Sequence, residues 1–245
     1  LNHKKCLSYI NFVKQEKRKN IKIIGKNILI CLPPSIGLGD SVEYALSIKA
    51  IINSGNFTNL GIAFVGRYKD IFQRYFNINN VYEEVISNEL IKKYDTIFHL
   101  TLEIKELSYQ KYDRQNIEQL VTNFFSVPKF RFLRKQKNNS IKKISIFPIS
   151  SSPIRTMPID LLNYIILKFV QKIDIEIILD NRSEISNYIE KKLYLDKAKI
   201  THPKNLNQLL KIIENINFGI FMDSGPLHLA KILNKKGILI SSSVG

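Results

Sequence analysis

The sequence is poor in cysteine and has no tryptophan, since its 245 residues include only two cysteines, Cys6 and Cys31. Neither belongs to a CxxC motif or to a cluster with histidine, which argues against a disulfide framework and a structural zinc site. No apolar run reaches the roughly 18–20 residues of a membrane-spanning helix. The segment 1–20 lacks the long apolar core and small-residue cleavage site of a signal peptide. We therefore expect a cytoplasmic protein without a metal site.

Acidic residues are also scarce, because 21 Asp and Glu stand against 37 Lys and Arg, which gives a formal net charge of +16. Such an excess suits nucleic acid, an anionic membrane surface or a phosphorylated substrate. An AT-rich genome, which favours the codons of Ile, Asn and Lys, would produce part of the same excess. With 44% hydrophobic residues, 10 Gly and 8 Pro, the composition is nevertheless that of a globular protein. It excludes collagen-like and wholly disordered chains.

Short apolar runs alternate with helical patterns in two series. The first predicts strands at 27–32, 60–66, 80–85 and 95–101, with helices at 40–53, 67–76, 88–94 and 113–125. The second predicts strands at 143–149, 174–180, 198–203, 217–223 and 236–243, with helices at 160–173, 183–193, 206–216 and 225–234. Such alternation is typical of α/β proteins with parallel sheets. We therefore predict two Rossmann-like domains facing a cleft, with ligands at the carboxyl ends of the strands.

The domain boundaries follow from shifts in composition. Residues 1–26 form a basic N-terminal extension, and 27–128 the first domain. A basic linker over 129–142 separates it from a second domain at 143–245. The chain begins with Leu1 and ends directly after a strand-like run, so we expect the second domain to be truncated at its C-terminal end.

The first motif is the glycine-containing loop after the first strand, with Gly37, Gly39 and Asp40. Glycines in such a loop let a ligand approach the backbone closely. The third glycine of the dinucleotide fingerprint is missing, which argues against NAD binding. Asp40 and Glu43 have the spacing of a capping box, so Asp40 is predicted either to cap the helix or to act as a carboxylate base in the cleft.

The second motif follows a late strand and comprises Asp223, Ser224, Gly225, Pro226, Leu227 and His228. The unpaired amides and the dipole of a helix N-terminus favour an anion, so this segment is predicted to bind phosphate. Pro226 is tolerated there because the first helical turn needs no amide hydrogen from it. His228 would lie in the same turn, near a bound diphosphate or its ribose.

Together, Gly39–Asp40 and the segment D-S-G-P-x-H-L-A resemble the motifs of glycosyltransferase family nine, the ADP-heptose:lipopolysaccharide heptosyltransferases and their relatives. The resemblance runs from Asn27 to Gly245 and implies the GT-B fold, with an acceptor-side first domain and a second domain that binds a nucleotide sugar. It implies an inverting, metal-independent transfer of a sugar, heptose from ADP-heptose, to a lipopolysaccharide-type acceptor. The nucleotide sugar is then a substrate, and no cofactor is expected.

The resemblance also implies roles for single residues. Asp40 becomes the general base that activates the acceptor hydroxyl. Arg155 stands where the family usually has a lysine and would bind the diphosphate together with the amides of Ser224 and Gly225. The acidic residue that contacts the ribose corresponds to Glu184 or Asp180.

Some features have no match in the family pattern. Met157 replaces the aromatic residue that usually follows the lysine, which changes the packing near the nucleotide or sugar. His99 and His202 have no matched role and are assigned to structure. The basic stretches 14–26 and 129–143 suit a solvated tail and linker or a peripheral association with the inner membrane.

Three alternatives remain open. A GT-B transferase or an epimerase that uses another nucleotide sugar would have the same fold. A basic nucleic-acid-binding protein would account for the charge and for the aromatic residues near 129–135, but no RNP, KH or helix-turn-helix pattern supports it, so we expect no nucleic acid partner. A truncated chain that binds nucleotide without transferring a sugar is the third.

Overall fold

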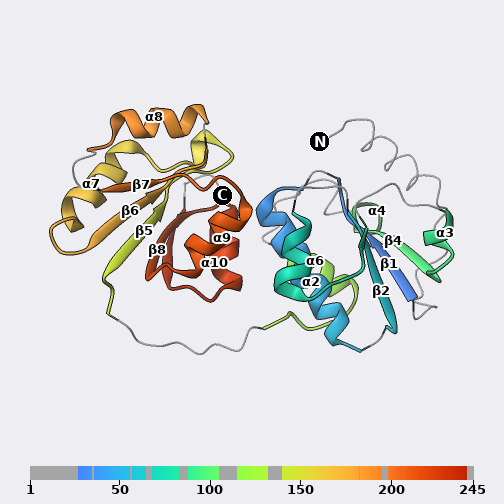
Figure 1. Ribbon diagram of the computed structural model, residues 1–245. Helices are drawn as coiled ribbons and strands as arrows, with labels where there is room; N and C mark the ends of the chain where they lie inside the picture. The colour runs from blue at the N-terminus through green and yellow to red at the C-terminus, as the bar shows by residue number, and fades with distance from the viewer. Residues whose placement is uncertain are drawn as a thin grey trace. The chain divides into compact units, whose positions relative to one another are not determined.

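The computed structural model describes residues 27–34, 36–55, 57–64, 68–82, 88–104, 115–131, 140–181, 183–194 and 198–241. The chain divides into two compact units, Leu1–Arg131 and Phe132–Gly245, each of which contains a parallel sheet flanked by helices (Figure 1). The extension 1–26, most of the linker and residues 242–245 lie outside the described residues.

Unit 1 contains a four-stranded parallel sheet in the order β3-β2-β1-β4. Its strands are β1 (Asn27–Cys31), β2 (Asn59–Ala63), β3 (Val81–Tyr82) and β4 (Thr96–His99). The central strand β1 is buried from Ile28 to Cys31, as expected for an apolar run in a parallel sheet covered on both faces. Its helices are α2 (Leu38–Asn53), the π-helical turn η1 (Ile71–Tyr75), α3 (Asn88–Ile91), α4 (Leu100–Glu103) and α6 (Ile117–Phe124).

Helices α2 and α6 are joined through the buried carboxylate of Glu43. Glu43 Oε2 accepts a hydrogen bond from the Glu118 amide at 3.2 Å, and Oε1 accepts one from Asn116 Nδ2 at 3.3 Å. A carboxylate at the N-terminus of α6 satisfies an amide that has no partner within the helix. The expected capping box of Asp40 and Glu43 is therefore wrong, because Glu43 stabilises the start of a different helix.

Unit 2 contains a five-stranded parallel sheet in the order β7-β6-β5-β8-β9. Its strands are β5 (Lys143–Phe147), β6 (Asp174–Ile178), β7 (Lys199–Thr201), β8 (Phe218–Met222) and β9 (Gly237–Ile240). Its helices are the 3-10 turn η2 (Pro153–Arg155), α7 (Ile159–Phe169), α8 (Glu184–Lys192), α9 (Leu206–Glu214) and α10 (Gly225–Ile232). Figure 1 shows α7 and α8 on one side of this sheet and α9 with α10 on the other.

The strand order locates the ligand edge of unit 2. The chain moves outward from β5 through β6 to β7, then returns to place β8 on the other side of β5. The order therefore reverses between β5 and β8. In open α/β sheets, ligands bind beyond the carboxyl ends of the strands at such a switch point. The loops that follow Phe147 and Met222 are consequently where a ligand is expected.

The predicted α/β alternation is confirmed in the described residues, with most elements one to three residues shorter than expected. The expected helix at 67–76 differs, since its central turn, Ile71–Tyr75, is π-helical. Within the described part of the chain, no helix is long and apolar enough to cross a membrane.

Candidate functional site

Arg155 and Asp223 meet at the switch point between β5 and β8. Arg155 ends the turn η2 in the loop after β5, and Asp223 directly follows β8. Arg155 Nη1 lies 3.6 Å from Asp223 Oδ2, and both side chains are partly exposed. Arg155 Nη2 also donates a hydrogen bond to Ser151 Oγ at 3.1 Å. Two of the residues predicted for the donor site thus form an ion pair at one edge of the sheet.

The loop that carries Arg155 is held by its own hydrogen bonds. The Ser150 amide donates to Thr156 Oγ1 at 3.2 Å, and Ser150 Oγ donates to the backbone carbonyl of Asp223 at 3.2 Å. The Met157 amide donates to the carbonyl of Pro148 at 2.8 Å, and the Met157 side chain is buried in the core. These contacts fix the backbone on both sides of Arg155, which limits the positions that its guanidinium can take.

The first turn of α10 provides backbone donors beside this ion pair. Ser224 is the N-cap, but its hydroxyl donates to the carbonyl of Met222 at 3.3 Å and does not cap the helix. The Leu227 amide donates to the carbonyl of Ser224 at 3.0 Å, and Pro226 has no amide hydrogen. Gly225, the first helical residue, has no acceptor within the helix. Its amide and the dipole of α10 therefore favour the binding of an anion at this edge. His228 lies half-buried in the same turn.

A pocket of about 530 Å³ opens next to Arg155. Thr156, Met157 and Pro158 line one side of it, and Glu184 and Tyr188 from α8 line the other. Most of the remaining lining side chains are aliphatic. Small-molecule sites commonly have such apolar walls with few polar groups.

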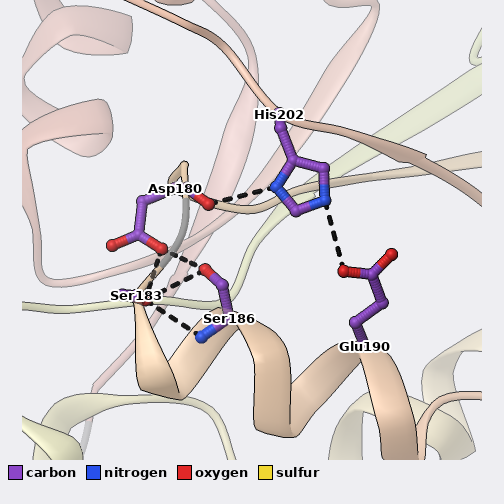
Figure 2. A network of polar contacts seen from close by, with 5 residues as sticks. All are labelled: Asp180, Ser183, Ser186, Glu190 and His202. Atoms are coloured by element: carbon purple, nitrogen blue, oxygen red, sulfur yellow. Dashed lines mark hydrogen bonds and ion pairs between the residues drawn. The ribbon is translucent and has the colours of Figure 1, made fainter.

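The start of α8, which carries Glu184, is anchored by Asp180 (Figure 2). Asp180 Oδ1 accepts hydrogen bonds from Ser183 Oγ at 2.5 Å and from Ser186 Oγ. Ser183 is the N-cap of the helix, and its Oγ accepts from the Ser186 amide at 3.0 Å. One oxygen of Asp180 is thus committed to the helix start, whereas Glu184 is exposed on the pocket wall. Of the two carboxylates considered for a ribose contact, Glu184 is the one that lines the pocket.

His202, which directly follows β7, contacts helix α8 and the loop before it. Its Nδ1 lies 3.1 Å from the carbonyl oxygen of Asp180, and its Nε2 lies 3.5 Å from Glu190 Oε2 (Figure 2). The structural role expected for His202 thus consists of contacts with Asp180 and Glu190, which the sequence does not indicate. The three residues come from three separate segments, so no local pattern could reveal these contacts.

Asp40 lies in unit 1, in the first turn of the helix that follows β1. The helix begins at Leu38 with Gly37 as its N-cap, so the expectation that Asp40 is the N-cap is wrong. The extended backbone of Gly37 lets the helix start two residues earlier and places Gly39 inside its first turn. Asp40 instead accepts a hydrogen bond from the Gly37 amide at its Oδ2, at 3.4 Å.

The carboxylate of Asp40 is exposed, and the buried Tyr44 lies one helical turn after it in α2. Burial, followed by the charge of Asp40, raises the pKa of the Tyr44 hydroxyl well above its ordinary value. Tyr44 therefore stays protonated at neutral pH and adds no second negative charge beside Asp40.

Comparisons with known proteins give structural matches only. Neither a comparison with models of protein families nor a search of curated proteins finds a match. Among solved structures, E. coli ADP-heptose lps heptosyltransferase II is 14% identical with a TM-score of 0.59, over 87% of this chain and 84% of that chain. A family 9 glycosyltransferase from Veillonella parvula is 12% identical with a TM-score of 0.58, over 91% and 88%.

A third structure is TibC from enterotoxigenic E. coli, a dodecameric iron-containing heptosyltransferase in complex with ADP-D-beta-D-heptose. It is 13% identical with a TM-score of 0.62, over 91% of this chain and 60% of that chain. Each of these matches covers most of this chain and therefore includes parts of both units. The chain therefore has the GT-B fold that the heptosyltransferases and the family 9 glycosyltransferase share.

Proposed function

We propose that the protein is a glycosyltransferase that uses a nucleotide sugar donor. The observation that carries this proposal is the meeting of Arg155, Asp223 and the first turn of α10 at the switch point of unit 2. A guanidinium beside an unpaired backbone amide suits a diphosphate, because both donate charge-assisted hydrogen bonds to phosphate oxygens. The GT-B fold of the chain supports the same class of reaction.

The nucleoside of the donor occupies the pocket next to Arg155. Its aliphatic walls contact the base, and Glu184 accepts hydrogen bonds from the ribose hydroxyls. Thr156 and Met157 directly follow Arg155, so a base in the pocket and a diphosphate at Arg155 are compatible with one extended ligand. Asp223 and His228 lie beside the diphosphate position, where they contact the donor.

The transfer inverts the anomeric centre. Asp40 takes the proton of the acceptor hydroxyl while that oxygen attacks the anomeric carbon, and the nucleoside diphosphate leaves with the bonding electrons. Arg155 and the amide of Gly225 stabilise the negative charge that develops on the leaving group. Gly37 and Gly39 form the backbone beside Asp40 on the acceptor side.

ADP-heptose is the proposed donor, and a lipopolysaccharide-type molecule the proposed acceptor. ADP-D-beta-D-heptose is bound in the TibC structure, and a structure of E. coli WaaC contains ADP-2-deoxy-2-fluoro heptose. TibC is also described as iron-containing. Within the described residues, no three side chains of His, Cys, Asp or Glu come together as a metal site, so we assign no residue to iron.

Calorimetric titration with ADP, UDP and GDP tests the proposal, with single-stranded RNA as the control. Selective ADP binding that weakens in Arg155→Ala would support it. Selective binding of UDP or GDP would keep the nucleotide site and change the donor. Binding of RNA alone, unaffected by Arg155→Ala, would contradict the proposal.

A further inference from the structure

Large hydrophobic side chains are exposed mainly around two helices of unit 2. Among the described residues, eight large hydrophobic side chains are exposed. Five of them lie on or beside α7 and α8. Ile154 and Tyr188 line the pocket described above, whereas Tyr164, Leu167 and Tyr194 lie outside its lining. Exposed apolar groups that gather in one place commonly mark an interaction surface, whereas scattered ones need no explanation.

On α7, the exposed apolar groups share one side of the helix with a lysine. Tyr164, Leu167 and Lys168 follow helical spacing, whereas Leu162 and Ile166 are buried against the core. Lys168 Nζ donates a hydrogen bond to Tyr164 Oη at 3.1 Å and lies 5.3 Å from the centre of the Tyr164 ring. The outer side of α7 is therefore both aromatic and positively charged.

The end of α8 continues this surface. Lys191 and Lys192 occupy its last turn, and Tyr194, which is 56% exposed, follows it. Asn163 of α7 joins the two helices, because its Nδ2 donates to the carbonyl of Lys192 at 3.1 Å and its Oδ1 accepts from the Tyr194 amide at 3.3 Å. We call the resulting surface the α7–α8 face, which consists of Tyr164, Leu167, Lys168, Lys191, Lys192 and Tyr194.

The acidic and basic residues of these helices lie mostly at opposite ends, with Glu190 next to Lys191 as the exception. The acidic Asp160 and Glu184 occupy the first turns, and Glu190 is paired with His202. Lys168, Lys191 and Lys192 lie in the last turns. The first turns lie at the carboxyl edge of the sheet, because each helix begins where the preceding strand ends. The positive groups are thus displaced from the edge that carries Arg155 and Asp223.

We propose that the α7–α8 face binds the surface of an anionic lipid bilayer. Tyrosine is enriched at membrane interfaces, where its ring is apolar and its hydroxyl remains hydrated. Lysines next to such aromatic groups are attracted to anionic headgroups, and Leu167 adds an aliphatic contact that does not stack on nucleic acid bases. Binding through this face leaves the carboxyl edge of unit 2 accessible. The proposal does not depend on the identity of the donor.

Flotation with lipid vesicles tests the lysines of the face. Vesicles of phosphatidylglycerol and phosphatidylethanolamine in equal parts are compared with vesicles of phosphatidylcholine. Because each lysine near an anionic surface contributes about fivefold in affinity, Lys168→Gln/Lys191→Gln/Lys192→Gln should weaken binding to the anionic vesicles roughly a hundredfold. The matched control, Lys142→Gln/Lys204→Gln/Lys211→Gln, removes three exposed lysines elsewhere in unit 2 and should stay within about threefold of the original protein.

The apolar groups are tested at constant charge. Tyr164→Ser/Leu167→Ser/Tyr194→Ser should weaken vesicle binding at least about tenfold. The serines remove most of the apolar area that the face would bury in the bilayer interface. The control, Ile141→Ser/Ile238→Ser/Leu239→Ser, replaces the three exposed hydrophobic residues that lie away from α7 and α8, and it should bind like the original protein. Unchanged thermal unfolding and ADP titration would show that each variant is folded.

Three results would overturn the proposal. Equal losses of binding to the anionic vesicles in the two lysine variants would show that net charge alone drives binding. Full vesicle binding by the Tyr164→Ser/Leu167→Ser/Tyr194→Ser variant would show that the face does not meet lipid. Loss of single-stranded RNA binding in that variant, with vesicle binding retained, would assign the face to nucleic acid instead.

Discussion

Arg155 and Asp223 form an ion pair, with Nη1 and Oδ2 3.6 Å apart, at the edge of unit 2 where β5 and β8 end. The proposed diphosphate ligand must share this guanidinium with the carboxylate. The two side chains should therefore affect anion binding in opposite directions. We expect Asp223 to weaken the binding of a diphosphate by itself, whereas a sugar attached to the diphosphate would bring hydroxyl groups that can donate to the same carboxylate.

Arg155→Ala should weaken ADP binding about tenfold to a hundredfold, because a charged hydrogen bond contributes about 1.5–3 kcal/mol. Asp223→Asn should bind ADP at least as tightly as the original protein, since a negative charge is removed beside the phosphates. Calorimetric titration measures both. Lys231→Ala, which removes a cation from the last turn of α10, is the matched control for Arg155→Ala. Weaker ADP binding by Asp223→Asn would contradict the assigned arrangement.

The Asp40→Asn variant should lose transfer activity and keep its affinity for the donor nucleotide. General base catalysis contributes about 10²–10⁴-fold, so kcat should fall by that factor while ADP affinity stays unchanged. Asn keeps an oxygen that accepts from the Gly37 amide, and the helix start is therefore preserved. The check is a transfer assay together with calorimetry on the same preparation. Equal loss of donor binding and of transfer would mean that Asp40 has a structural role.

The α/β order could be predicted from the sequence because each strand and helix is specified by local periodicity. The run at 27–32 and the helical spacing at 40–53 appear in the structure as β1 and α2. The start of α2 was misplaced by two residues, because the extended backbone of Gly37 decides it and nothing in the local composition favours Gly37 over Asp40 as the N-cap.

Contacts between distant segments could not be predicted in the same way. Glu43 has the spacing of a local capping residue, but its partners are Asn116 and Glu118, which only the packing of α2 against α6 brings near. The Arg155 and Asp223 motifs were both identified from the sequence, whereas their ion pair was not. It depends on the strand order that places β5 beside β8.

Glu184→Ala should lower the affinity for ADP about tenfold to a hundredfold, because ribose hydroxyls would lose a charged acceptor. The same substitution should not change the affinity for 2′,3′-dideoxy-ADP, which lacks those hydroxyls. Calorimetric titration of the original protein and of Glu184→Ala with each nucleotide measures the four affinities that this comparison needs. Equal losses for the two nucleotides would remove Glu184 from the ribose site. Asp160→Ala, in the first turn of α7, is a matched control.

Glu43→Ala should destabilise unit 1 by about 1–3 kcal/mol, because it leaves the buried amide of Glu118 and Nδ2 of Asn116 without their acceptor. Urea denaturation measures the change in the free energy of unfolding. Glu89→Ala, which removes an exposed carboxylate from α3, should stay within about 0.5 kcal/mol of the original protein. Equal destabilisation by the two variants would contradict the role of Glu43 in joining α2 to α6.

Glu176 should make the stability of unit 2 depend on pH in the acid range. Burial by itself would raise the pKa of Glu176, but hydrogen bonds from Lys143 Nζ at 2.5 Å and Thr201 Oγ1 at 2.6 Å outweigh it and hold the pKa below its ordinary value of 4.5. A carboxylate whose pKa is lower in the folded state stabilises the protein fully above its unfolded pKa. This contribution is lost as the pH falls through the lower, folded pKa.

The free energy of unfolding should therefore decrease below about pH 4.5 more steeply in the original protein than in Glu176→Gln. Urea denaturation at pH values from neutral to acid gives both slopes. Thr201→Val removes one of the two hydrogen bonds and should give an intermediate slope, because the Lys143 ion pair remains. If Glu176→Gln kept the full acid dependence, other carboxylates would have to account for it, and the Lys143–Glu176 pair would contribute nothing to folding in this range.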